Sequence, residues 1–292
     1  MKRIALLGPG TYTEESAHHF LGNKAFQYVN CKLIDDVFMS TVNGASDYSV
    51  IPIENTFDGS VRLHLDWLAN EVDLPMQAEW VYPISISLHG VRPVGESLEA
   101  DCRSLTKIIS HGVTLTQCRQ FLQRYLPHAE LEQVGSNGEA ARQVKELGRP
   151  DVAALAPFSA GLLYGLDTWA RDMQDHHNNY TRFVLVGNEP IRLAAEPSST
   201  KTTILVTLPE DYPGALHQML SAFAWRRINL SKIESRPTKK KLGTYYFFID
   251  IEASMDSVLL PAALQEIEAI GCQVRILGCY PTYTYDPLHA EV

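Results

Sequence analysis

The chain has 292 residues, of which 45% are hydrophobic, so it is long and apolar enough to form packed cores in two domains. Its formal net charge of -9 argues against a nucleic acid or an anionic membrane as partner, because those surfaces attract basic patches. The five cysteines include no CxxC pair and no Cys/His spacing typical of zinc, so we expect free thiols and no metal site.

No part of the sequence predicts export or a membrane span. The start, MKRIALLGPG, has only a short apolar run before its Gly-Pro-Gly. No later segment approaches the roughly 18 uncharged apolar residues of a spanning helix. We therefore expect a cytoplasmic protein that does not bind a membrane.

The first two thirds of the chain alternate predicted strands and helices. An apolar run at 4–7 ends at Gly-Pro-Gly, and TYTEESAHHFL follows with the Thr/Glu spacing of a capped helix start. The strand-then-helix order recurs at YSVIPIEN and SVRLHLDWLANE, TKIISHG and VTLTQCRQFLQRYL, ELEQVGS and NGEAARQVKEL, and DVAALAP and FSAGLLYGL. Such repeats predict an α/β fold with mostly parallel strands.

Polar residues at strand ends are the candidates for a binding site, because ligands of α/β sheets bind beyond the carboxyl ends of strands. Glu54 and Asn55 end one predicted strand. Thr181 and Arg182 instead begin the strand FVLVG. They can join the same site only if that strand runs opposite to its neighbours.

A change of composition follows residue 187. The stretch GNEPIRLAAEPSST has small residues, two prolines and no clear period, which is typical of a linker. The block after it reads as strand, helix, two strands, helix and strand. This βαββαβ order predicts a small domain with an antiparallel sheet.

Several motifs in this order resemble one known family. VIPIENTFDGSV resembles its PIEN segment, NNYTRFVLV resembles its N-[FY]-T-R-F motif, and YGL at 164–166 also fits. In the C-terminal block, GALHQMLSAF and KIESRP resemble the GAL and ESRP signatures of an ACT regulatory domain. Over roughly residues 2–281 the chain thus resembles the monofunctional prephenate dehydratases, which make phenylpyruvate on the route to phenylalanine.

The resemblance implies a catalytic domain at 1–190 with two α/β lobes, similar to a periplasmic binding protein, and an active site in the cleft. One lobe would hold about 1–80 and 165–190, and the other about 81–164. The parts that follow would be a linker at 191–200, an ACT domain at 201–281 and a C-terminal tail at 282–292.

The implied reaction removes the ring hydroxyl of prephenate as water while carbon dioxide leaves. It needs a proton donor, groups that hold two carboxylates, and exclusion of water, but no cofactor. The threonine of the TRF motif is held to be essential in the family, which implies a catalytic Thr181. Because a threonine hydroxyl is a weak acid, we expect a hydrogen bond to the leaving hydroxyl rather than complete proton transfer.

Three further catalytic candidates lie near Thr181 in this reading. Arg182 could clamp a carboxylate or form an ordinary ion pair, because alternation sends it to the strand face opposite Thr181. Asn55 could orient a substrate carboxylate or hydroxyl. Glu54 would repel a dianion if ionised, so it must be protonated, paired with a base or turned aside, and a structural role is the alternative.

The resemblance also implies a set of substrate-binding residues: Thr11, Thr13, Ser110, His111, Ser136, Asn137 and Phe183. Ser110 and the N–H groups of the next helix suit a carboxylate, with a helix cap as the alternative. Phe183 could equally pack in the core. Three loops depart from the family's motifs: the first is one residue shorter, Ser110-His111-Gly112 replaces Ser-His-Pro, and Ser136-Asn137-Gly138 replaces Ser-Thr-[AG].

The small domain is expected to bind phenylalanine between neighbouring subunits. A glycine at the start of its first helix lets a ligand approach backbone N–H groups. By resemblance the effector residues are Gly214, Ala215, Leu216, Glu234, Ser235, Arg236 and Pro237. Because pairing removes an exposed sheet edge, we expect a homodimer or homotetramer through the ACT domains.

Other functions remain open for the sequence. An added acid in the pocket would favour arogenate dehydratase, whose substrate has an ammonium where prephenate has a ketone. A non-aromatising prephenate decarboxylase would keep the ring hydroxyl and would not need Thr181. A non-catalytic amino-acid sensor would bind ligands without turnover.

Overall fold

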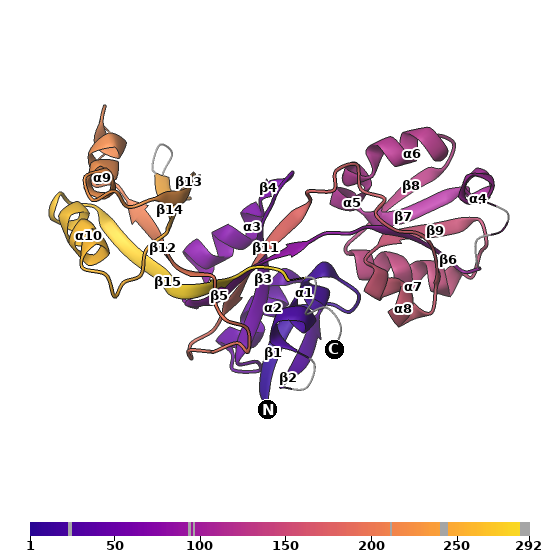
Figure 1. Cartoon of the computed structure of the whole chain (residues 1–292), viewed down its shortest axis with the longest axis horizontal. Coiled ribbons are helices and arrows are strands. Elements are labelled where there is room, and N and C mark those ends of the chain that lie inside the picture. The colour runs from indigo at the N-terminus through magenta and orange to yellow at the C-terminus, as the bar shows by residue number, and fades with distance from the viewer. Residues whose placement is uncertain (23–24, 93–94, 96, 211, 240–244, 287–292) are drawn as a thin grey trace. The chain divides into compact units, whose positions relative to one another are not determined.

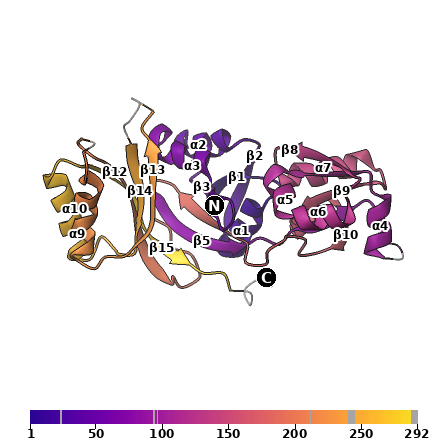
Figure 2. The same ribbon diagram turned by 90° about the horizontal axis from the view of Figure 1, so that it is seen from above.

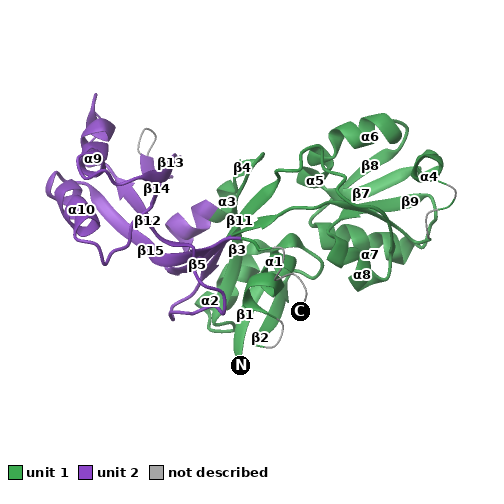
Figure 3. Cartoon of the chain, viewed as in Figure 1, with its two compact units in different colours: residues 1–64, 81–183, 285–292 green, residues 65–80, 184–284 purple. Residues whose placement is uncertain are grey.

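The computed structural model describes residues 1–22, 25–92, 95, 97–210, 212–239 and 245–286 (Figure 1). The chain forms two compact units: residues 1–64, 81–183 and 285–292, and residues 65–80 and 184–284 (Figure 3). Within the described residues, no helix is long and apolar enough to cross a membrane.

The first sheet of the first unit is parallel. Its strands are β1 (Lys2–Leu7), β2 (Phe26–Cys31) and β3 (Tyr48–Asn55), in the order β2-β1-β3, and its helices are α1 (Tyr12–Leu21) and α2 (Ile34–Val42). Thr11 caps α1, since its hydroxyl accepts a hydrogen bond from the N–H of Glu14. The predicted helix start is therefore confirmed.

The second sheet of this unit is mixed. Its order is β10-β6-β9-β7-β8, from β6 (Ser87–Gly90), β7 (Lys107–His111), β8 (Glu130–Val134), β9 (Val152–Ala156) and β10 (Asp167–Ala170). β7 is parallel to β8 and β9, whereas β6 is antiparallel to β9 and β10. Its helices are α4 (Leu98–Ser104), α5 (Gly112–Gln117), α6 (Arg119–Tyr125), α7 (Asn137–Leu147) and α8 (Phe158–Tyr164).

β10 lies beyond the boundary of about 164 that the sequence suggested for this lobe. Its pairing with β6 keeps residues 167–170 in the second sheet, so the chain leaves that sheet only after Ala170.

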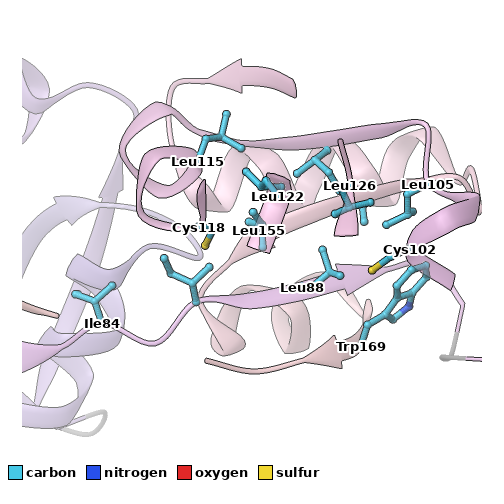
Figure 4. Close-up of a cluster of buried hydrophobic side chains, with 13 residues drawn as sticks. Ile84, Leu88, Cys102, Leu105, Leu115, Cys118, Leu122, Leu126, Leu155 and Trp169 are labelled. Carbon is cyan, nitrogen blue, oxygen red and sulfur yellow. The ribbon is translucent and has the colours of Figure 1, made fainter. Parts of the chain in front are cut away.

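A cluster of buried apolar side chains covers one face of the second sheet (Figure 4). Leu88 and Leu155 of the strands meet Leu122 of α6 there, and each fully buried leucine contributes roughly 1.5–3 kcal/mol. Two of the free thiols, Cys102 and Cys118, are part of this core. Burial raises the pKa of Cys102 to about 11 and that of Cys118 further, so both remain neutral thiols.

Strand β11 (Tyr180–Val186) runs opposite to its neighbour β3. The N–H of Thr56, just after β3, donates to the carbonyl of Tyr180 at 2.9 Å, so the end of one strand lies beside the start of the other. The carbonyl of Asn179 similarly accepts from Ile84, just after β5 (Met76–Pro83), at 2.8 Å. The orientation required for Thr181 and Asn55 to meet is thus confirmed.

After β3 the chain turns back through β4 (Gly59–Ser60), which pairs antiparallel with the last two residues of β3. It continues as α3 (Arg62–Asp66) and a π-helix, η1 (Trp67–Glu71). The pattern of SVRLHLDWLANE predicts one ordinary helix here, whereas the structure has the end of β4, a short α-helix and a π-helix.

The second unit contains the predicted βαββαβ domain, which the structure confirms. Its elements are β12 (Ser199–Thr207), α9 (Ala215–Ala224), β13 (Leu230–Pro237), β14 (Tyr245–Ile251), α10 (Leu259–Ala269) and β15 (Gln273–Tyr283). The strands pair antiparallel in the order β13-β14-β12-β15, so β13 is at the edge. Both helices pack on one face of this sheet (Figure 2).

A buried histidine fixes α8 against the second sheet. His89 is fully buried, with Nδ1 3.1 Å from the hydroxyl of Thr168 and Nε2 3.1 Å from the carbonyl of Pro157. Burial lowers its pKa, so the ring stays neutral. Gly161 of α8 lies directly over this ring, where a Cβ atom would overlap it.

We predict that Gly161→Ala lowers the free energy of unfolding. Overpacking costs typically about 1–3 kcal/mol, which exceeds the gain of up to about 1 kcal/mol from replacing a helical glycine. Urea unfolding measures the change. Gly135→Ala is the matched control, because no atom lies within 4 Å of its Cβ position. Equal stability of the two variants would contradict the packing account.

Candidate active site

Asn55 and Thr181 meet where β3 ends and β11 begins. The side-chain amide of Asn55 donates from Nδ2 to the hydroxyl of Thr181 at 3.0 Å and to Oδ1 of Asn179 at 2.8 Å. Its Oδ1 accepts from the N–H of Phe57 at 2.9 Å. Because both ends of the amide are held, Asn55 presents a fixed donor to the Thr181 hydroxyl.

Gln117, the last residue of α5, joins these side chains. Its Oε1 accepts from Asn179 Nδ2 at 2.8 Å, and its Nε2 lies 3.4 Å from Asn55 Oδ1 and 2.5 Å from a carboxylate oxygen of Asp58. We call Asn55, Gln117, Asn179 and Thr181 the amide cluster. It joins the first sheet, which carries Asn55, to a helix of the second.

Neither Gln117 nor Asn179 was predicted from the sequence. Asn179 is the asparagine of the N-[FY]-T-R-F motif and directly precedes the strand of Thr181, so the motif was the available signal for it. For Gln117 the signal was weak, because it only lies in a helix that begins at the end of a strand. A glutamine in VTLTQC is equally typical of a solvated helix face.

Arg182 and Glu54 form a second pair, separate from the amide cluster. Arg182 Nη1 lies 3.3 Å from Glu54 Oε2, and the arginine is largely buried. Because side chains alternate along a strand, Thr181 meets Asn55 while Arg182 meets Glu54. Of the alternatives left open for Glu54, the structure shows the pairing with a base, which is Arg182.

Cavities open at two places of interest among the described residues of the first unit. The larger, about 630 Å³, is lined by Leu7, Gly8, Pro9, Thr11, Cys31, Lys32, Gly135, Ser136, Glu139, Arg142 and Tyr164. The smaller, about 220 Å³, is lined by Phe57, Asp58, Thr116, Gln117, Gln174, Asp175, His176 and Asn179. Gln117 and Asn179 therefore place the amide cluster on the wall of the smaller cavity.

Two candidate substrate-binding residues cap helices at the larger cavity. The hydroxyls of Thr11 and Ser136 accept from the N–H groups of Glu14 and Glu139, in the first turns of α1 and α7. The positive ends of both helix dipoles are therefore directed at the cavity wall. Thr13 also belongs to α1, but its side chain is buried.

Ser110 and Asn137 lie in a buried hydrogen-bonded group beside α5. The Ser110 hydroxyl donates to the carbonyl of Leu155 at 2.6 Å. Asn137 Oδ1 accepts from Thr114 at 2.8 Å and lies 3.4 Å from the Ser110 hydroxyl. Ser110 is therefore not a helix cap, because the capping position of α5 belongs to His111.

His111 and Phe183 differ in their surroundings. His111 is partly buried, and its pKa is lowered by that burial while the charge of Asp58 opposes the shift. Its ring is therefore neutral at neutral pH, which makes it a hydrogen-bonding group rather than a cation. Phe183 is fully buried, as the alternative of core packing predicted.

Gly138 accounts for one of the departing loops. A Cβ atom at this position would overlap the carbonyl oxygen of Pro9. The start of α7 therefore touches the loop after β1, and only glycine allows so close an approach. This contact brings the two sheets of the first unit together beside the larger cavity.

The candidate effector residues come from two elements of the second unit. Gly214 directly precedes α9 with φ of 96°, a conformation that favours glycine. Glu234, Ser235, Arg236 and Pro237 end the edge strand β13. The guanidinium of Arg236 is bonded to Asp66.

Across the part of the chain that is described, no group of three or more His, Cys, Asp or Glu could hold a metal ion.

Comparison with known proteins identifies both parts of the chain. The prephenate dehydratase family model matches residues 4–191, and the ACT domain model matches residues 202–271. The prephenate dehydratase of Bacillus subtilis is 41% identical over 287 residues, which cover 96% of this chain and 99% of that protein.

Solved structures agree with this match. Prephenate dehydratase from Arthrobacter aurescens, in complex with L-Phe, has a TM-score of 0.81 and 33% identity, covering 95% of this chain and 89% of that one. GqqA, described as a novel type of quorum quenching acylase, has a TM-score of 0.80 and 25% identity, covering 98% and 99%. Because proteins of this fold are described as two different kinds of enzyme, the fold alone does not identify the reaction. The site residues must be consistent with it as well.

An α/β region with a polar cluster, followed by an ACT domain, defines a regulated enzyme with separate catalytic and effector domains. The chain belongs to the prephenate dehydratase family, lyases that convert prephenate to phenylpyruvate with loss of water and carbon dioxide.

We predict that Gln117→Leu lowers kcat/KM for prephenate by about 10²-fold, the loss that a small displacement of a catalytic group can cause. The leucine cannot hold Asn55 and Asn179. The matched control is Gln120→Leu, since Gln120 is exposed and only its backbone N–H is bonded, to Asp175. Steady-state assays decide, and equal loss in both variants would contradict a role for the cluster.

Proposed function

We propose that the amide cluster is the catalytic centre of this prephenate dehydratase and that Thr181 donates a hydrogen bond to the leaving ring hydroxyl. The main observation in favour of this proposal is the 3.0 Å hydrogen bond from Asn55 to Thr181. It occupies a lone pair of the threonine oxygen and leaves the hydroxyl hydrogen to point elsewhere. Among the described residues, no acceptor takes that hydrogen.

A fixed donor suits this reaction because the leaving oxygen gains negative charge as its bond to the ring breaks. A hydrogen bond aimed at that oxygen is stronger in the transition state than in bound substrate. Asn55 holds the hydroxyl of Thr181, and the amides of Asn179 and Gln117 hold Asn55, so the restraint on the hydroxyl comes from neutral side chains. The neutral His111 is a second hydrogen-bonding group of the same site.

The two carboxylates of prephenate need positive groups, which the larger cavity supplies. The first turns of α1 and α7 face it, and Lys32 lies in its lining. Helix α5 links the two regions, because Thr114 bonds Asn137 beside Ser136 while Gln117 bonds Asn55. The carboxylates then lie toward the larger cavity and the ring hydroxyl toward Thr181.

Arg182 acts indirectly in this proposal. Its pairing with Glu54 neutralises a carboxylate one residue from Asn55, so that the strand end does not repel a dianion. Of its two alternatives, the ion pair is favoured over a direct clamp on substrate.

We further propose that phenylalanine binds the ACT domain and alters the rate. The ACT match and the L-Phe complex of the Arthrobacter relative support this. Backbone N–H groups at Gly214, Ala215 and Leu216 would receive the carboxylate, beside Glu234 to Pro237 of a neighbouring subunit. The edge position of β13 supports assembly of a cytoplasmic homodimer or homotetramer through this domain.

The experiment mixes purified protein with prephenate near neutral pH and identifies the product by NMR. Phenylpyruvate supports the proposal. A non-aromatic decarboxylated product, or no product, would overturn it, and arogenate would then be tested as the substrate.

We predict that Thr181→Ala lowers kcat by about 10²–10⁴, the usual value of positioned proton donation, while Thr181→Ser keeps much of the rate. The matched control is Thr41→Ala, which removes an equally buried, hydrogen-bonded threonine of α2. Its expected effect is on stability alone. Full activity of Thr181→Ala would refute the assignment.

A further inference from the structure

A partly buried ion-pair cluster joins the end of α3 to the ACT strands. Asp66, the last residue of α3, accepts from Arg236 Nη2 at 2.6 Å and from Arg236 Nε at 3.1 Å. Lys239 Nζ lies 2.9 Å from its other oxygen. The side chains of Asp66 and Arg236 are only 14% and 11% exposed.

The charges of this cluster depend on one another. Burial alone would raise the pKa of Asp66, but hydrogen bonds from Lys239 and Arg236 lower it overall. Asp66 is thus ionised at neutral pH and remains paired with Arg236 and Lys239. Removal of Asp66 would leave the guanidinium of Arg236, which is only 11% exposed, with a longer contact of 3.6 Å to Glu234 Oε1, which is unfavourable.

A second arginine holds the next residues of the same segment. Arg275 of β15 donates to the carbonyl of Ala69 at 3.1 Å and also to that of Leu68. Both carbonyls belong to the π-helix η1. Arginines of two ACT strands, β13 and β15, thus form hydrogen bonds to one short stretch of chain, from Asp66 to Ala69.

Helix α3 connects this stretch to the catalytic strand. Its residues 62–64 belong to the first unit and 65–66 to the second. His64, two residues before Asp66, is buried with Nδ1 2.6 Å from the carbonyl of Pro52 in β3. Burial lowers the pKa of His64, so the neutral ring donates this bond.

The turn before α3 is held to β3 as well. Val61 donates to the carbonyl of Ile53 at 2.9 Å, and β4 pairs Gly59 with Asn55. Between the catalytic Asn55 and Asp66 the chain is therefore tied back to β3 at each turn. These bonds form a continuous connection along the chain from Asp66 to Asn55.

From this geometry we propose that Asp66 is a positioning residue. Its ion pairs with Arg236 and Lys239 fix the position of the end of β3, and phenylalanine changes catalysis by disturbing these ion pairs. The inference rests on the proposed function, since it requires prephenate turnover at Asn55 and an effector near Arg236. An effector bound beside Glu234 to Pro237 would contact the end of the strand that carries Arg236 and so alter the pairing of its guanidinium with Asp66. Coupling of this kind is reciprocal in its binding free energies.

The test measures prephenate turnover against phenylalanine concentration for the full chain, with phenylalanine binding followed separately by calorimetry. Typical couplings change affinity about 5- to 150-fold, and we expect Asp66→Asn to lose most of such a factor while it still binds phenylalanine. Its KM or kcat without effector should also change. Asp66→Glu, which keeps the charge, should restore much of the response.

Asp73→Asn is the matched control, because Asp73 follows in the same segment and its side chain is exposed. It should respond to phenylalanine as wild type does. If Asp66→Asn does not fold, Lys239→Met removes the more exposed partner, which is 53% exposed, and should weaken the response without loss of phenylalanine binding.

The outcomes separate the two proposals. A wild-type response in Asp66→Asn, or in Lys239→Met where that is the variant measured, would overturn the inference and leave the proposed function intact. So would a wild-type enzyme that turns over prephenate but ignores phenylalanine. A wild-type protein without prephenate turnover would overturn the proposed function first, and the inference with it.

Discussion

The candidate site depends on one constraint, the opposite direction of β11 relative to β3. A parallel β11 would place Thr181 at the far edge of the sheet from Asn55. Because the strand is reversed, the polar start of one strand meets the polar end of the other, and Asn55 donates to the hydroxyl of Thr181. The same pairing sends Arg182 to Glu54. Because side chains alternate along each strand, the neutral hydrogen-bonding pair and the ion pair are kept separate.

This separation suits the chemistry of the family. A threonine hydroxyl is a weak acid, so its contribution depends on being held in place rather than on readily losing a proton. Asn55, Asn179 and Gln117 provide that restraint through hydrogen bonds and carry no charge. The ion pair one residue away removes the repulsion that an isolated glutamate would exert on a substrate with two carboxylates.

Local signals in the sequence predicted much of the fold. The capped start at Thr11, the repeated strand-helix order and the βαββαβ domain follow from spacing and capping within a few residues. The motifs of the family brought Asn55 and Thr181 into one site. Contacts between distant segments were missed, because Gln117 and Asp66 have no local pattern that distinguishes them from solvated helix residues. The antiparallel β6 and β10 were missed for the same reason, since pairing partners are far apart in sequence.

The central claim is that Asn55 and Thr181 act as one unit, and a double-mutant cycle on kcat tests it most directly. Single-turnover rates would be measured for wild type, Asn55→Ala, Thr181→Ala and the double variant. If Asn55 serves to hold the Thr181 hydroxyl, the double variant should be hardly slower than the more damaged single variant. Losses that multiply in the double variant would mean that the two side chains act independently and would contradict this account.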